Sequence, residues 1–81
     1  MNQQPQETPE LIALAKQYEH VTRLVAQSFQ KQLDLARAEG NQEEVIKNEI
    51  KLGIMRAARG LFSGAYRSVT HIKPEGNWGE L

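Results

Sequence analysis

Few residues in this 81-residue chain are suited to chemistry, and they lie far apart. The chain has no cysteine, which excludes a thiol nucleophile, a disulfide and a cysteine-based zinc site. Its two histidines, His20 and His71, stand in no metal-ligand spacing. Ser63 has glycines on both sides but lacks the spacing of a nucleophile elbow and a nearby base. We therefore expect a protein that is not an enzyme and that uses no metal, cofactor or small-molecule substrate.

A basic edge in the second half of the chain is the first candidate for a binding surface. Wound as a helix, its arginines fall on one side, and no acidic residue occurs between Glu49 and Glu75. Guanidinium groups without an acidic neighbour bind phosphates or carboxylates. The alternative is that they pair with acids of the first half or of a second copy. The candidate residues for partner or phosphate binding, including the tryptophan near the C-terminus, are Arg56, Arg59, Ser63, Arg67, Lys73 and Trp78.

Small residues form a neighbouring strip on the same expected helix, at Gly53, Ala57, Gly60 and Gly64. An interior glycine costs a helix up to about 1 kcal/mol relative to alanine, so three of them need a reason. The strip predicts close packing of a neighbouring helix, within a hairpin or a dimer. The alternative is a kink or partial break of the helix at residues 60–64.

The local sequence predicts where the helices begin and end. Thr8 is a suitable N-cap, followed by Pro9 at the first helical position. Gly40 is suited to a C-cap, and Asn41 caps a second helix with Glu44 three residues later. We expect an all-α, antiparallel two-helix hairpin with helices at about 9–39 and 42–68. Residues 1–8 are expected to form a disordered tail, and residues 69–81 an extended or flexible tail.

Apolar residues at spacings of three and four define one face on each expected helix. On the first helix they are Leu11, Leu14, Ala15, Tyr18, Val21, Val25, Phe29, Leu33 and Ala36. On the second they are Ile46, Ile50, Ile54, Ala57, Ala58, Leu61, Phe62, Ala65, Tyr66 and Val69, with Val45 and Leu52 off this face. Two helices alone bury little apolar surface, so we expect a homodimer that forms a four-helix bundle.

The C-terminal segment leaves two alternatives open. Residues 68–73 are β-branched and alternating, and Pro74 ends any helix before it, so a short extended strand is possible there. Trp78 either folds back onto the helices or stays exposed as a docking anchor.

Composition limits the classes of protein that fit. The net charge is zero, but residues 1–49 carry five basic and eight acidic side chains, and residues 50–81 carry five and two. No apolar run approaches the roughly 20 residues of a membrane span, and the N-terminus lacks the pattern of a signal peptide. We expect a cytoplasmic protein with no membrane partner.

Three hypotheses about function follow. The first is an adaptor or regulator that binds a larger protein through the second helix and the tail. The second is a nucleic-acid-binding regulator that uses the arginine edge. The expected architecture is comparable to Rop-type RNA-binding hairpin dimers, although no motif is shared. The third is a structural subunit that assembles further through the glycine strip.

Overall fold

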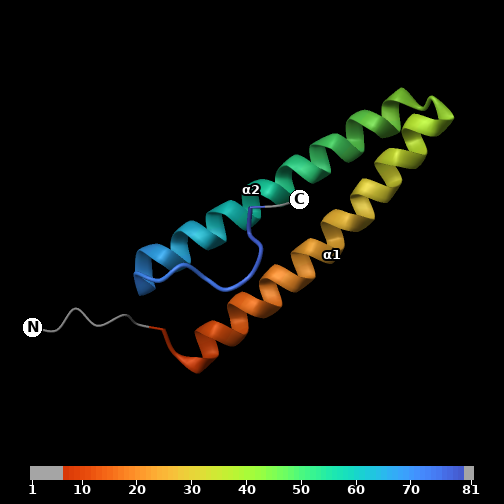
Figure 1. Ribbon diagram of the computed structural model, residues 1–81. Coiled ribbons are helices and arrows are strands. Elements are labelled where there is room, and N and C mark those ends of the chain that lie inside the picture. The colour runs from red at the N-terminus through yellow and green to blue at the C-terminus, as the bar shows by residue number, and fades with distance from the viewer. Residues whose placement is uncertain (1–6, 80–81) are drawn as a thin grey trace, which may run out of the picture.

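The computed structural model describes residues 7–79, and this part of the chain contains two helices and no strand. Helix α1 spans Pro9–Glu39 and helix α2 spans Gln42–Thr70. The two helices run antiparallel along their length in a molecule of 60 × 17 × 14 Å (Figure 1). The predicted all-α hairpin is confirmed. The predicted disordered tail lies largely in residues 1–6, outside the described residues.

Short-range capping interactions set three of the four helix ends. The Thr8 hydroxyl accepts a hydrogen bond from the Leu11 amide at 3.2 Å. Gly40 adopts the left-handed conformation with φ of 68°, and Asn41 accepts a hydrogen bond from the Glu44 amide at 3.3 Å. These interactions involve neighbours in the sequence, which is why the predicted ends agree with the structure.

Helix α2 ends at Thr70, two residues beyond the predicted end. The Thr70 hydroxyl donates a hydrogen bond to the Tyr66 carbonyl at 2.8 Å, and His71 closes the helix with φ of 61°. The strand-like segment expected from residue 68 is therefore wrong for its first residues, which are helical. The helix also continues without a break through Gly60 and Gly64.

Within residues 7–79, the interior consists of two hydrophobic clusters between the helices. Nearer the connecting turn, Ala26, Leu33 and Leu52 are buried together. Nearer the chain ends, Ala15, Tyr66 and Trp78 are buried together. The second cluster needs residues from the C-terminal tail, so the tail belongs to the fold.

The face of α2 that packs on α1 differs from the predicted face. The buried residues of α2 are Asn48, Leu52, Arg59, Tyr66 and Thr70. Among the residues expected inside, Ile46, Ile50, Ile54, Leu61 and Val69 are exposed, and the exposed fraction of Leu61 is 75%. The residues of α2 that contact α1 recur at alternating steps of four and three along the sequence. This line is the packing face of the helix, although it contains polar side chains.

Helix α1 shows a smaller version of the same difference. Leu14 and Val21 were expected inside and are exposed, whereas Glu19 and Thr22 are buried. Glu19 and Thr22 lie opposite Arg59 of α2, and their burial leads to the principal polar cluster of the molecule.

Candidate functional site

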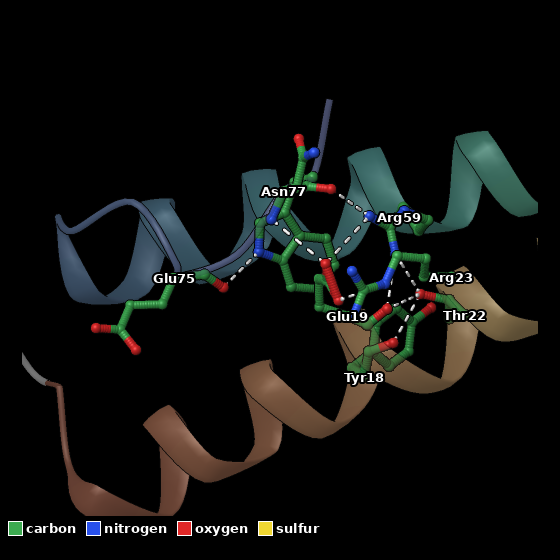
Figure 2. Close-up of polar contacts among 8 residues, drawn as sticks. Tyr18, Glu19, Thr22, Arg23, Arg59, Glu75 and Asn77 are labelled. Carbon is green, nitrogen blue, oxygen red and sulfur yellow. Dashed lines mark hydrogen bonds and ion pairs between the residues drawn. The ribbon is translucent and has the colours of Figure 1, made fainter. Parts of the chain in front are cut away.

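The C-terminal tail folds back along the hairpin and places Trp78 between the two helices. The exposed fraction of Trp78 is 9%, and its ring stacks on Phe62 with centroids 5.2 Å apart. Tyr18 stacks on Phe62 in turn at 4.3 Å. The indole N–H donates a hydrogen bond to the Glu75 carbonyl at 2.9 Å (Figure 2). Of the two alternatives for Trp78, the structure shows the folded-back one.

Arg59 joins α1, α2 and the tail. Its side chain is fully buried, and its guanidinium donates hydrogen bonds to the Glu19 carbonyl and the Thr22 hydroxyl, both at 2.8 Å. A third hydrogen bond goes to the Asn77 carbonyl at 2.5 Å (Figure 2). The guanidinium also lies 5.2 Å from the centre of the Trp78 ring. A buried cation is tolerated when it is hydrogen-bonded and charge-compensated. Here both terminal nitrogens of the guanidinium donate hydrogen bonds and Glu19 supplies the opposite charge, while the buried Nε has no hydrogen-bond partner.

The Glu19 carboxylate balances the charge of Arg59 and holds the tail. It lies 3.9 Å from the Arg59 guanidinium and 3.6 Å from Arg23, and it accepts a hydrogen bond from the Asn77 amide at 3.3 Å. Gly76 passes this carboxylate with φ of 120°, and a Cβ there would lie 2.9 Å from Cγ of Glu19. A side chain at residue 76 would thus strain the backbone and force the Glu19 side chain or the tail to shift.

A second contact ties the start of the described chain to the end of α2. The Tyr66 hydroxyl donates a hydrogen bond to the Glu7 carboxylate at 2.7 Å. Burial, followed by the hydrogen bond to Glu7, raises the pKa of Tyr66 to about 12. The phenol therefore stays protonated across the physiological pH range and keeps its role as donor.

The structure does not bring the predicted basic edge together as one surface. Arg56, Arg67 and Lys73 are exposed, and Ser63 is half-buried. Arg59 is used inside the fold and contacts Trp78, so these two candidates serve the attachment of the tail. The alternative that an arginine pairs with Glu19 of the first half is realised by Arg59.

Arg56 lines a shallow depression of about 430 Å³ between the helices. Its walls also include Gln30 and the ion pair of Arg37 with Glu49, whose charged atoms are 3.2 Å apart. The depression thus combines both charge signs in an open, polar setting. Nothing in this arrangement selects a particular ligand.

The predicted strip of small residues faces away from α1. A Cβ added at Gly53, Gly60 or Gly64 would have no atom within 4 Å in the described structure, and Ala57 is exposed as well. Close packing between α1 and α2 therefore does not explain these glycines. Close packing against a second chain stays a prediction.

The sequence did not predict a surface of exposed apolar side chains, because the apolar pattern assigned most of these residues to the interior. On α2 they are Ile46, Ile50, Ile54, Leu61 and Val69; on α1 they are Leu14, Val21, Leu24 and Leu35. Leu14, Val21 and Leu35 are separated by multiples of seven residues, a spacing that places them in one line along a helix. The sequence does contain a signal for the face of α2 that packs on α1. From Val45 to Tyr66 the residues of that face recur at regularly alternating steps of three and four.

Comparison with known proteins gave no match to a protein family, a curated protein or a solved structure. Neither described helix is long and apolar enough to cross a membrane. Among residues 7–79 no group of three histidine, aspartate or glutamate side chains is placed to hold a metal ion.

Proposed function

We propose that this chain is a small non-enzymatic adaptor or regulatory protein that binds other proteins through apolar side chains on the outside of the hairpin. The observation that carries the proposal is the exposure of large apolar side chains on both helices: Ile46, Ile50, Ile54 and Leu61 on α2, and Leu14, Val21 and Leu35 on α1. Soluble monomers rarely present such large apolar side chains in a continuous surface, and an extended apolar patch marks a contact site.

The same surface supports a homodimer of four helices. The hairpin buries only two small hydrophobic clusters, and much of the apolar surface of α2 remains outside them. Association of two hairpins would bury that surface and stabilise both copies by mass action. The proposal therefore includes a homodimer, to which α2 contributes its outward side.

A larger partner protein then has the line Leu14, Val21 and Leu35 on α1 as its contact surface. These residues belong to the helix that the homodimer leaves available. The expectation that the tail captures the partner has less support, because Trp78 is buried and Asn77 is bonded to Arg59. In the proposal the tail fixes the two helices relative to each other.

A pair of matched variants tests the contact on α1. The face variant carries Leu14→Lys and Val21→Lys, and the control carries Gln17→Lys and Gln27→Lys, all at exposed positions of α1. We expect cross-linking in host cells, followed by mass spectrometry, to recover the same larger protein with the wild type and the control. The face variant should lose at least about tenfold of that protein, which corresponds to 1.4 kcal/mol. Equal recovery by all three chains would contradict this part of the proposal.

The nucleic-acid alternative keeps Arg56, Arg67 and Lys73 as exposed cations. It is weaker than the adaptor proposal because Arg59 donates its hydrogen bonds inside the fold and the net charge is zero. Binding to structured RNA that is lost between about 50 and 200 mM salt would favour the alternative.

A further inference from the structure

The chain reverses direction between α2 and the tail at a strained residue. His71 has φ of 61°, and within residues 7–79 it is the one residue other than glycine with a positive φ. This conformation strains an L-residue, because its Cβ comes close to the following carbonyl oxygen. A chain that continued straight from Thr70 would take a negative φ at residue 71 and would relieve the strain. Residue 71 is therefore a hinge that favours the straight form.

The tail docks on the hairpin through groups that any copy of the chain can supply. The Asn77 carbonyl accepts a hydrogen bond from Arg59, and the Asn77 amide donates one to Glu19. We infer that two copies of this chain exchange tails, so that residues 74–79 of each copy dock on the hairpin of the other. This association does not use the exposed apolar side of α2 and is independent of the proposed homodimer.

The direction of the docked tail suits this exchange. From Glu75 to Trp78 the tail runs antiparallel to α2 and returns as far as Phe62 (Figure 1). Two hairpins can lie end to end, with the C-terminal ends of their α2 helices facing each other. A tail that continues straight from one copy then runs antiparallel to α2 of the second copy. The same contacts form, and neither chain reverses at His71.

The tail is long enough to reach the second copy. Trp78 is eight residues beyond Thr70, and eight extended residues span up to about 26 Å. Phe62, on which Trp78 stacks, is eight residues before Thr70 on α2, a distance of about 12 Å along the helix. The difference leaves roughly 14 Å for the gap between the two helix ends.

The tail of the same copy competes with the exchange at low concentration. A short linker gives this tail an effective concentration in the millimolar range. Exchange keeps the contacts of the tail and relaxes two hinges per pair, so the exchanged pair is a minority species at micromolar concentration and grows by mass action. Each exchanged pair carries the exposed apolar side of α2 twice, which raises its avidity for a larger partner protein.

The ion pair between Lys16 and Glu75 makes the exchange measurable in the natural chain. The charged atoms are 3.2 Å apart and both side chains are exposed, so a carbodiimide can join them in an amide bond. Chains grown with natural nitrogen are mixed with chains grown with the heavy isotope, incubated, cross-linked and digested. Mass spectrometry gives the fraction of these links that join a light half to a heavy half. Links of Lys47 with Glu43 or Glu44, within one helix, are the control for random collision.

We expect the mixed fraction to rise at least about tenfold between roughly 10 µM and roughly 1 mM, while the control links stay unmixed. His71→Ala, which adopts a positive φ less readily, should raise the mixed fraction at least about tenfold above that of His71→Gly, which removes the hinge strain. Circular dichroism verifies that each variant is helical. Leu61→Lys should leave the mixed fraction unchanged, because Leu61 is exposed on the other side of α2.

Unmixed links between Lys16 and Glu75 at every concentration, in the wild type and in His71→Ala, would overturn the exchange. A mixed fraction that does not depend on residue 71 would overturn the hinge as its cause. The wild type and His71→Gly decide the question by themselves if His71→Ala loses its helicity. None of these results bears on the association through α2, which the mass of Leu61→Lys tests separately.

Discussion

Arg59→Met is expected to destabilise the chain by about 3 kcal/mol, the largest effect of any single charged-residue substitution in the described structure. The substitution removes hydrogen bonds to the Glu19 carbonyl, the Thr22 hydroxyl and the Asn77 carbonyl. It also leaves the buried Glu19 carboxylate without its nearest buried cation. Because an 81-residue protein has a total stability of roughly 4–12 kcal/mol, this loss is a large share.

Urea denaturation followed by circular dichroism measures the effect of Arg59→Met. The matched control is Arg56→Met, at an exposed position one turn earlier on α2, for which we expect a change within about 1 kcal/mol. Arg59→Lys should lose most of the stabilisation too, because an ammonium cannot reproduce the planar set of donors. Equal stability of the Arg59 and Arg56 variants would show that the buried network does not hold the fold together.

Trp78→Ala is expected to cost about 3 kcal/mol, because it removes the largest side chain of the cluster formed with Ala15 and Tyr66. Its ring contacts Phe62 and the Arg59 guanidinium, which lose their packing when the indole is absent. Since Trp78 and Arg59 share a contact, the two substitutions should not be additive, and the double variant should cost less than their sum.

Thermal unfolding of Trp78→Ala, of Arg59→Met and of the double variant measures this coupling. Leu35→Ala is the control, since Leu35 is exposed and its truncation should change stability by no more than about 0.5 kcal/mol. The fluorescence of Trp78 provides a second measurement in the wild-type chain. A spectrum like that of free tryptophan in water would contradict the folded-back tail.

The helices could be predicted from the sequence because their ends depend on neighbouring residues. Thr8, Gly40 and Asn41 cap through contacts that span no more than five positions in the chain. The extension of α2 to Thr70 was not predicted, because the sequence pattern indicates an extended segment there. In the structure the Thr70 hydroxyl donates a hydrogen bond to a carbonyl of the preceding helical turn, and the residues are helical.

The packing face of α2 could not be predicted from hydrophobicity. Its outward side carries more isoleucine and leucine than its inward side, which includes Asn48 and Arg59. Arg59 is accommodated inside only because the tail returns to supply the Asn77 carbonyl, a contact between residues 18 positions apart. A helical wheel contains no information about such a contact.

The predictions for the site also separate into those that depend on neighbouring residues and those that depend on contacts between distant parts of the chain. The predicted strip from Gly53 to Gly64 does lie on one face, because that follows from helical geometry. The use of this face does not follow from helical geometry, because a Cβ added at Gly53, Gly60 or Gly64 meets no atom within 4 Å in the described structure. The grouping of Arg59 with Arg56 and Arg67 was misleading, because neighbours on a helical wheel can differ completely in burial once a tail packs on the helix.

The central claim is that the exposed apolar side of α2, with Ile46, Ile50, Ile54 and Leu61, binds protein. Sedimentation equilibrium over a wide range of concentrations tests it most directly. We expect the wild-type chain to approach twice its monomer mass of 9.2 kDa at high concentration. Leu61→Lys should remain near 9.2 kDa, because Leu61 is 75% exposed in one chain and is the most exposed of the large apolar side chains on this side of α2. The control Leu35→Lys, on α1, should dimerise like the wild type. A wild-type mass of 9.2 kDa at every concentration, or equal dimerisation of the two variants, would contradict the claim.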